Sequence, residues 1–426
     1  ERVGRGPIFE ELFMPGPGFD LVGEEEIAEV VEVLRAGHIY RYGAPDNPNF
    51  RAKVWQFEEA VARQSQINHA VAVNSGTTAL WVTLMGLGIG PGDEVIVPGF
   101  TFIASIASII YARAVPVLAE IDRTFNLDPA DVEQKITPRT KAIMPVHLLG
   151  NLARMDELKA IADRHNLLLI EDCAQAFGAS YKGRPVGSMG DAGAFSFNYV
   201  KVITGGEGGM IITNNEEYYK RFFALHDHGH SPLRRGKEVG ERPFIGLDFR
   251  MTEFQGAVLL AQLRKLPYIR EHLHANKRLF KSLIADLPGL EFRELPDPDG
   301  EAATLLTLIL PSEEIARRLA ADLGIKVLAD AGWHVYNNME PILEKRLPVP
   351  HGCPFDCPDT YAQPVEYRPG MLPQTDALLA RAINIGIGIT DRGLGASFGL
   401  TIKDGQEAVG PKAAEFRRVA QRYLGN

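Results

Sequence analysis

The sequence predicts an α/β fold in two parts: a large domain over residues 1–270, with an N-terminal arm, and a smaller α+β domain over residues 271–426. Three observations support this prediction. From about residue 70, short runs that are apolar throughout alternate with helical stretches, which is typical of a mainly parallel sheet covered by helices. Beyond about residue 270 the alternation of short apolar runs with helical stretches does not continue, and a proline-rich stretch follows. In addition, 426 residues are too many for one ordinary core.

The first part is predicted to begin with a helix and to continue with a seven-stranded type of sheet. Apolar residues at i, i+3, i+4 and i+7 predict one amphipathic helix over 24–36, closed by Gly37. These residues are Ile27, Val30, Val31 and Leu34. Short apolar runs predict the strands, with helices expected up to residue 87 and over 102–113. The runs are residues 70–73, 95–97, 117–121, 142–144, 167–170, 193–197 and 210–212.

The second part is predicted to hold fewer regular elements. Residues 304–310 are expected to form a strand, and Ser312 is a candidate N-cap because two glutamates follow it in the first helical turn. The stretch 343–376 is rich in proline and should be mostly irregular. A helix over 411–423 is expected to close the chain.

Composition and charge exclude several classes of partner. A net charge of −9 and a pI near 5.7 argue against nucleic acid and anionic membranes, because both need clustered positive charge. No apolar run reaches the length of a membrane span, and no signal-like segment is visible. Three cysteines are too few for a disulfide framework, and they fit a reducing cytoplasm. We therefore expect a cytoplasmic protein.

A short segment holds His351, Cys353 and Cys357, which invites a zinc interpretation. Zinc needs a fourth ligand and a more suitable spacing, and this segment is interrupted by proline. An ordinary loop is the better interpretation, and we expect no metal site.

Lys201 is the strongest candidate for a catalytic residue. It lies five residues after Ser196 and just before a glycine-rich turn, where a lysine can be held as a Schiff base beside a bound phosphate. Asp172 follows a run of apolar residues, so we expect it at the buried end of a strand, where a pyridinium nitrogen would give it a partner. A capping aspartate is the plainer alternative. Together the two residues indicate pyridoxal phosphate (PLP) chemistry.

Other residues fit the same cofactor less specifically. Between a strand and a helix, Gly76 and Thr77 lie where free backbone N–H groups would bind an anion, although a plain N-cap turn explains them equally well in isolation. Phe102 could stack on the pyridine ring or belong to the core, and it fits the next helix start better than Phe100 does. Gln175 could donate a hydrogen bond to the cofactor's phenolic oxygen.

With these residues in order, the chain resembles the DegT/StrS-type sugar aminotransferases, a branch of the fold-type I PLP enzymes. The resemblance runs from about Gly37 to Leu266 and continues more loosely to the end. The matching segments are Ser75-Gly-Thr-Thr-Ala-Leu80, Gly88-Ile-Gly-Pro-Gly-Asp-Glu-Val-Ile-Val-Pro98, Pro145-Val-His-Leu-Leu-Gly150, Glu171-Asp-Cys-Ala-Gln175 and Gly206-Glu-Gly-Gly209. The family implies a homodimer whose two active sites share residues.

The resemblance also implies a role for each site residue. Lys201 would form the Schiff base, Asp172 would contact the pyridine nitrogen, and Phe102 would cover the ring face. The phosphate would be held by Gly76, Thr77 and Ser196, with Gln175 near the ring.

Loop segments add a local similarity to amino-octulosonate transaminases, and three positions depart from the family. The similarity includes a histidine cluster in which His228 is a candidate substrate contact. Phe177 stands where a histidine is frequent near the cofactor, and Tyr199 replaces a frequent proline. Asp248 stands where similar enzymes carry an asparagine that reaches the partner subunit's cofactor phosphate. A carboxylate there should repel the phosphate unless it is protonated or turned away.

The sequence therefore predicts an aminotransferase. An amino acid, glutamate or glutamine, would donate the amino group, and a keto- or aldehyde-sugar, a cyclitol or a related intermediate would accept it. One alternative is a PLP-dependent sugar dehydratase, which Lys201 argues against because those relatives use a histidine. A second alternative is a catalytically silent PLP-fold regulatory protein, which the intact Lys201, Asp172 and Ser196 argue against.

Overall fold

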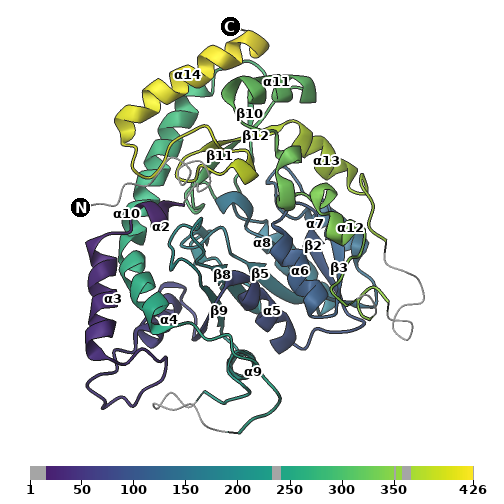
Figure 1. Ribbon diagram of the computed structural model, residues 1–426. Coiled ribbons are helices and arrows are strands. Elements are labelled where there is room, and N and C mark those ends of the chain that lie inside the picture. Colours follow the sequence, from purple (N-terminus) through teal and green to yellow (C-terminus); the bar gives the residue numbers. More distant parts are fainter. Residues whose placement is uncertain (1–15, 233–240, 350–351, 357–365, 426) are drawn as a thin grey trace.

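The computed structural model describes residues 16–232, 241–349, 352–356 and 366–425. A large sheet with helices on both faces forms its centre, and a smaller sheet and the C-terminal helix lie beside it (Figure 1). Among the described residues, no helix combines the length and apolar character needed to cross a membrane.

The central sheet has seven strands in the order β1-β9-β8-β5-β4-β2-β3. Neighbours pair in parallel except at β9, which runs antiparallel to both β1 and β8. The prediction of a mainly parallel sheet is confirmed. The strands are β1 (His69–Val73), β2 (Glu94–Pro98), β3 (Val115–Ala119), β4 (Thr140–Ile143), β5 (Leu168–Asp172), β8 (Ala192–Ser196) and β9 (Gly209–Thr213).

Both faces of this sheet are buried, which explains why its strands are apolar throughout. Along β1, Ala70 and Ala72 face one core and Val71 and Val73 face the other. The first core is covered by α4, α8 and α10, and the second by α5, α6 and α9. Their bounds are α4 (Lys53–Gln64), α5 (Gly76–Gly86), α6 (Ile103–Tyr111), α8 (Met155–His165), α9 (Glu216–His226) and α10 (Glu253–Ile284).

The second sheet follows α10 and consists of three antiparallel strands in the order β10-β11-β12. The predicted domain boundary at residue 270 falls inside α10, and the division into two domains stays a prediction. The elements of this part are β10 (Glu291–Phe292), β11 (Leu305–Ile309), α11 (Glu313–Leu323), α12 (Glu340–Leu343), α13 (Pro373–Ala380), β12 (Ala382–Gly386) and α14 (Gln406–Leu424).

Short elements connect the rest of the chain. The helices are α2 (Pro17–Asp20), α3 (Glu24–Ala36) and α7 (Pro129–Lys135), and β6 (Ser180–Tyr181) pairs with β7 (Arg184–Pro185). The 3₁₀ turns are η1 (Leu148–Gly150), η2 (Leu328–Asp330), η3 (Gly332–His334), η4 (Tyr336–Asn338) and η5 (Arg392–Leu394).

Several predicted element ends are shifted, and the contacts explain one of the shifts. Strand β3 was predicted over 117–121 but ends at Ala119. The next residue, Glu120, leaves the sheet because its carboxylate accepts hydrogen bonds from the backbone N–H groups of Gln374 and Thr375 at the start of α13. The closing helix α14 begins five residues before the predicted start, so Pro411 lies inside it.

The predicted ends of helix α3 are confirmed, and Gly37 caps the helix in a left-handed conformation. Its apolar face, however, points outward: Ile27 is 52% exposed and Leu34 is 56% exposed. The buried residues include Glu26, whose carboxylate accepts hydrogen bonds from Lys265 Nζ. An amphipathic helix ordinarily buries its apolar face. These exposed apolar residues therefore indicate a surface that contacts another protein chain.

The cysteines differ in state. Cys173 is free and buried, whereas Cys353 is disulfide-bonded, a single bond that the argument against a disulfide framework did not predict. The zinc alternative cannot be followed further, because His351 and Cys357 lie outside the described residues.

Candidate active site

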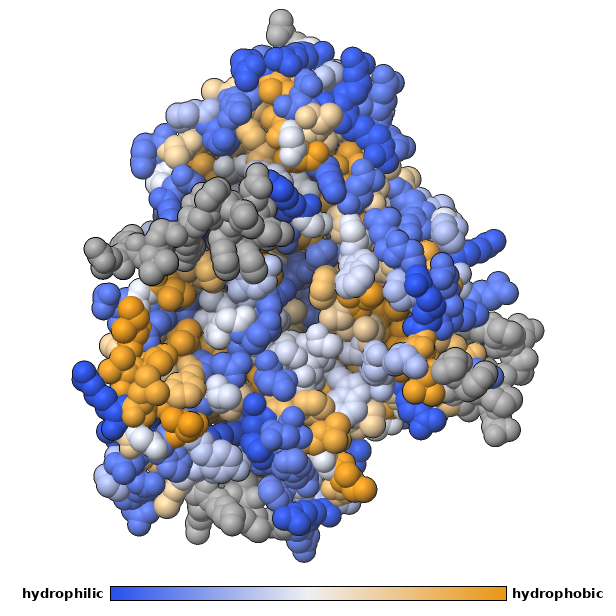
Figure 2. Space-filling model, viewed as in Figure 1, coloured by the Kyte–Doolittle hydropathy of each residue, from blue (hydrophilic) through white to orange (hydrophobic). Residues whose placement is uncertain are grey.

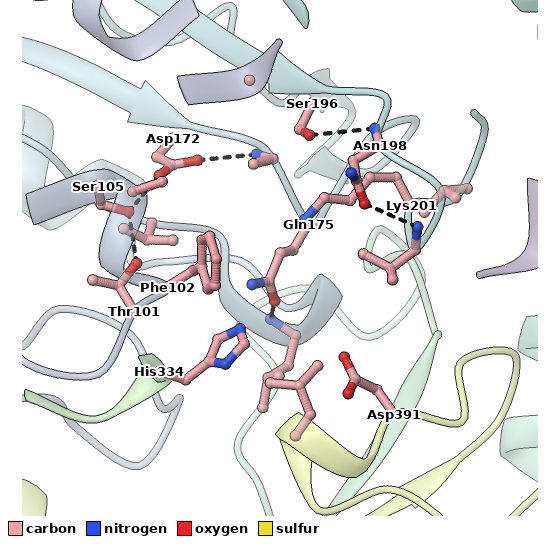
Figure 3. Close-up of a pocket in the computed structure, with 18 of the residues that line it drawn as sticks. Thr101, Phe102, Ser105, Asp172, Gln175, Ser196, Asn198, Lys201, His334 and Asp391 are labelled. Atoms are coloured by element: carbon pink, nitrogen blue, oxygen red, sulfur yellow. Dashed lines mark hydrogen bonds between the residues drawn. The ribbon is translucent and has the colours of Figure 1, made fainter. Parts of the chain in front are cut away.

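One pocket of about 370 Å³ gathers residues that lie far apart in the sequence (Figure 3). It lies where β1, β2, β5 and β8 lead into loops and where β9 begins, and the second part of the chain closes it with His334 and Asp391. Seven predicted site residues line it. They are Gly76, Thr77, Phe102, Asp172, Gln175, Ser196 and Lys201.

Lys201 lies in the loop between β8 and β9, and its backbone N–H donates to the Asn198 carbonyl at 3.0 Å. Desolvation lowers the pKa of its amine below the ordinary lysine value, while the charges of Asp172 and Asp391 act in the opposite direction. A lysine whose pKa falls is neutral, and hence nucleophilic, over a wider range of pH.

Asp172 stands at the end of β5 and is almost fully buried. Its Oδ2 accepts a hydrogen bond from Ser105 Oγ at 2.7 Å, and its Oδ1 accepts one from the Ala174 N–H at 3.1 Å. The Ser105 hydroxyl also lies 2.7 Å from Thr101 Oγ1, which fixes its position. Burial raises the pKa of Asp172, so a cationic N–H partner would stabilise its charged form.

The start of α5 packs tightly against the end of β8. Ser75 caps the helix, its side chain accepting from the Thr78 N–H at 3.1 Å. A Cβ added to Gly76 would lie 2.5 Å from the Cβ of Ser196, so only glycine fits here. The close approach brings the Ser196 hydroxyl next to free backbone N–H groups, which together suit a phosphate.

Phe102 and Gln175 form two walls of the pocket. Phe102 is 42% exposed, and its ring centroid lies 5.1 Å from that of His334, whereas Phe100 is fully buried in the core. Gln175 Oε1 accepts a hydrogen bond from the Leu149 N–H at 2.9 Å, which leaves its amide NH₂ group as a donor.

The sequence did not reveal four other residues of the pocket: Thr101, Ser105, His334 and Asp391. Ser105 lies one turn after Phe102 at the start of α6, so helical spacing could have indicated it. His334 and Asp391 come from loops of the second part, where no motif marks them. Burial lowers the pKa of His334 to about 3, so its imidazole is neutral near Lys201.

Two candidates lie outside this pocket. The Asp248 carboxylate is 2.5 Å from Arg250 Nη2, and His228 Nε2 is 3.9 Å from Asp248. Phe177, which replaces a frequent histidine of the family, does not line this pocket but packs edge-on against Phe195 at a centroid distance of 5.3 Å.

A buried group of His147, Glu171 and Cys173 has the composition of a metal site. However, the His147 Nδ1 atom accepts from the Ala153 N–H, and Nε2 lies 3.1 Å from the Glu171 carboxylate. That carboxylate also accepts three backbone N–H bonds, at 2.7 to 2.8 Å. Hydrogen bonding among the described residues therefore accounts for this cluster.

Comparisons with known proteins agree with this site. The model of the DegT/DnrJ/EryC1/StrS aminotransferase family matches residues 20–340. GDP-perosamine synthase of Caulobacter vibrioides is 51% identical over 225 residues, which are 53% of this chain and 59% of that protein. An L-glutamine:2-deoxy-scyllo-inosose aminotransferase of Streptoalloteichus tenebrarius is 40% identical, over 64% of this chain and 68% of its own length.

Solved structures show the same fold over nearly the whole chain. An aminotransferase from Psychrobacter cryohalolentis is 28% identical, with a TM-score of 0.76, and the match covers 97% of this chain and 100% of that one. A 3-amino-5-hydroxybenzoic acid synthase is also 28% identical, with a TM-score of 0.76, over 96% and 100% of the two chains. Fold and site thus define a PLP-dependent aminotransferase of fold-type I. The chain belongs to the DegT/DnrJ/EryC1/StrS aminotransferase family.

The residues of the pocket fit pyridoxal phosphate, the cofactor of this family. Ser196 and the start of α5 would hold the phosphate, in the cradle that only a glycine at 76 permits. Asp172 offers a buried carboxylate to the pyridine nitrogen, and Lys201 offers a desolvated amine to the aldehyde. The donor set therefore matches the polar groups of the cofactor.

Proposed function

We propose that this protein transfers an amino group from an amino acid to the carbonyl of a sugar, a cyclitol or a related polyhydroxylated intermediate. The observation that carries the proposal is the convergence of Lys201, Asp172 and the cradle formed by Gly76 and Ser196 in one pocket. No single one of these features would suffice, because lysines, buried aspartates and capped helices are all common.

Each residue has a separate task in this proposal. The bound cofactor supplies an electron sink. Lys201 would hold it through its Nζ, and the same Nζ would serve as the base that removes a proton from the donor's α-carbon. Asp172 keeps the ring nitrogen protonated, and Ser105 orients the Asp172 carboxylate. Gln175 donates towards the ring, and Phe102 covers one side of it.

The donor and acceptor classes come from the relatives. Relatives named as L-glutamine-dependent aminotransferases favour glutamine as the donor, with glutamate as the other candidate. Their acceptors are inosose cyclitols, whereas the perosamine synthase makes a nucleotide-linked amino sugar. Hydroxyl groups of either class would meet Asp391, His334 and Thr77, which line the pocket.

A spectroscopic experiment tests this function. PLP-loaded protein is mixed with L-glutamine or L-glutamate, and the absorbance of the Lys201-bound cofactor is followed. We expect it to disappear and to return when 2-deoxy-scyllo-inosose or another keto-polyol is added. GDP-perosamine, offered as an amino donor, tests the nucleotide-sugar class in reverse. If neither the amino acids nor the amino sugar changes the spectrum, the proposal is wrong and the silent regulatory protein is favoured.

We also infer a homodimer with shared active sites. The exposed apolar residues of α3 and the loop after it support this inference, and Figure 2 shows apolar side chains gathered over α3. Further large apolar side chains are exposed next to Asp248. The residues are Val22, Ile27, Leu34, Ile39, Tyr40, Ile245 and Leu247. Light scattering, which measures the molar mass in solution, tests the dimer. The Ile27→Asp variant should be monomeric, whereas the control variant Tyr268→Asp should remain dimeric.

In this dimer we propose that Asp248 lies near the partner's cofactor phosphate but does not itself bind it. Arg250 binds both Asp248 and Asp227, and its guanidinium offsets their charge. It could then act as the donor to the phosphate, in the place of the family's asparagine. His228, beside Asp248, would reach the same shared site as a substrate contact.

A cytoplasmic location is also proposed. The acidic composition and the free thiol of Cys173 support it, whereas the disulfide at Cys353 counts against it. Fractionation of the producing cells with an antibody to the chain decides between a cytoplasmic and an exported pool.

A further inference from the structure

A second cavity, of about 230 Å³, is lined by an arginine that has no ion-pair partner among the described residues. Arg270 projects from α10, and its Nε atom is buried without any hydrogen bond. Across the described part of the chain its guanidinium makes no ion pair, and only desolvation acts on its pKa, which is lowered. Arg270 is half-buried, and partial burial of a cation without a compensating charge is costly, so the arginine indicates a missing partner.

The remaining walls of this cavity suit a negatively charged ligand. They come from the end of α4, the β6–β7 hairpin and the aromatic residues Phe177 and Phe195. Ser65 and Ser180 contribute hydroxyl groups to the lining. The lining holds no aspartate or glutamate. The eleven residues are Gln64, Ser65, Phe177, Gly178, Ala179, Ser180, Gly183, Pro185, Val186, Phe195 and Arg270.

We propose that this cavity is a binding site for a small oxyanion, a phosphate or a carboxylate, held by Arg270 with help from Ser65 and Ser180. A guanidinium matches both anions because its planar N–H groups bind two oxygens at once. The cavity is much larger than the space one water molecule needs. Most buried cations in the described part of this acidic chain have a carboxylate partner, as Lys277 has in Glu301 at 2.5 Å, whereas the half-buried Arg270 has none there.

The site is separate from the active pocket but adjoins the same strand. The two cavities have no lining residue in common. Phe195 directly precedes Ser196 on β8, and Phe177 follows Gln175 by two residues. An anion at Arg270 would therefore bind behind the segments that hold the cofactor residues, without entering the pocket itself.

Thermal unfolding of the holoenzyme tests the proposal. The cofactor is first fixed to Lys201 by borohydride, so that its phosphate fills the active pocket, and the ionic strength is held constant with sodium chloride. Inorganic phosphate and citrate are then titrated separately. We expect one or both to raise the Tm by about 1–3 °C at ten times the Kd. A response to phosphate alone identifies a phosphate site, and a response to citrate alone identifies a carboxylate site.

Variants assign the effect to the cavity. Arg270→Gln should lose the shift, and Ser65→Val, which keeps the arginine but fills the cavity, should reduce it at least threefold. Arg278→Gln is the matched control, since it removes a paired arginine from the same helix and should keep the full shift. Because Arg270 has no partner to lose, Arg270→Gln should fold normally. A wild-type protein that responds to neither anion, or a shift that persists in Arg270→Gln, overturns the proposal.

Discussion

Lys201 is half-buried, and its amine is desolvated at the edge of a pocket that also holds Asp172. We expect borohydride reduction of the PLP-loaded protein, followed by peptide mapping, to label Lys201. Lys201→Ala should still bind the cofactor through its phosphate but should lose turnover by several orders of magnitude, as removal of a covalent catalyst does. Label on any other lysine would contradict this role.

Asp172 should control the rate of proton abstraction more than the binding of the cofactor. Asp172→Asn leaves the ring nitrogen without an anionic partner and so weakens the electron sink. Single-turnover kinetics with an α-deuterated donor should show a slower, isotope-sensitive step. Ser105→Ala, which removes one hydrogen bond to the carboxylate, should cause a smaller loss. Proton transfer at the wild-type rate in Asp172→Asn would refute the assignment.

Asp391 offers a test based on pH. Its carboxylate favours the charged form of Lys201, and the Gly393 N–H holds it in place at 2.6 Å. Asp391→Asn should therefore lower the pKa of Lys201 further, so that the neutral amine persists to lower pH. The rate at which apoenzyme captures PLP should show its acid limb at lower pH than in the wild type. Asp330→Asn, remote from the pocket, should leave the profile in place.

The Asp248→Asn variant distinguishes two roles of this carboxylate: repulsion of the partner's cofactor phosphate, or pairing with Arg250. If it lies near the partner's phosphate, Asp248→Asn should tighten PLP binding, by about 1 kcal/mol at a partly solvated site. Arg250→Gln should then weaken PLP binding, because it removes the proposed phosphate donor. If Asp248 serves only to hold Arg250, its variant should instead lower the Tm or weaken the dimer while the Kd for PLP stays the same. Equilibrium titration of PLP into the apoenzymes measures the Kd for PLP of each variant and so decides between the two roles.

At the scale of elements, the junction of α5 with β8 is the tightest contact in the active pocket. Gly76→Ala would force Ser196 or the start of α5 to move, since the new Cβ would lie 2.5 Å from that of Ser196. We expect unfolding to become easier by about 1–3 kcal/mol, and PLP to bind at least tenfold more weakly, about 1.4 kcal/mol. Gly410→Ala in α14, where nothing lies within 4 Å of the added Cβ, should be neutral or stabilising.

Local patterns predicted the elements and the residues at their ends. Strands buried on both faces produce continuous apolar runs, and Asp172 and Ser196 end two such strands, so their positions followed from the sequence. Contacts between distant segments were not predictable. The apolar face of α3 is exposed because Glu26 and Lys265 form the buried contact instead, and only the folded chain brings these two together.

At the scale of the whole molecule, both parts of the chain build one pocket. The cofactor residues that line the pocket all precede residue 202, whereas His334 and Asp391 close the pocket from the second part. The first group carries motifs, because the chemistry of one cofactor restricts residue type and spacing. The second group lies in irregular loops, so neither hydrophobic period nor spacing marks it. We therefore expect His334 and Asp391 to determine the substrate specificity of the enzyme.

The position of β1 at one edge of the large sheet has a consequence for protein synthesis. β1 ends at Val73, yet β9, with which it pairs over its whole length, begins only at Gly209. During translation the apolar strand therefore leaves the ribosome long before its partner exists, and pairing between such distant segments is slow. An unpaired apolar strand is an aggregation hazard. We expect nascent chains that do not yet include Gly209 to depend on chaperones. The supply of chaperones should then limit the yield of folded enzyme.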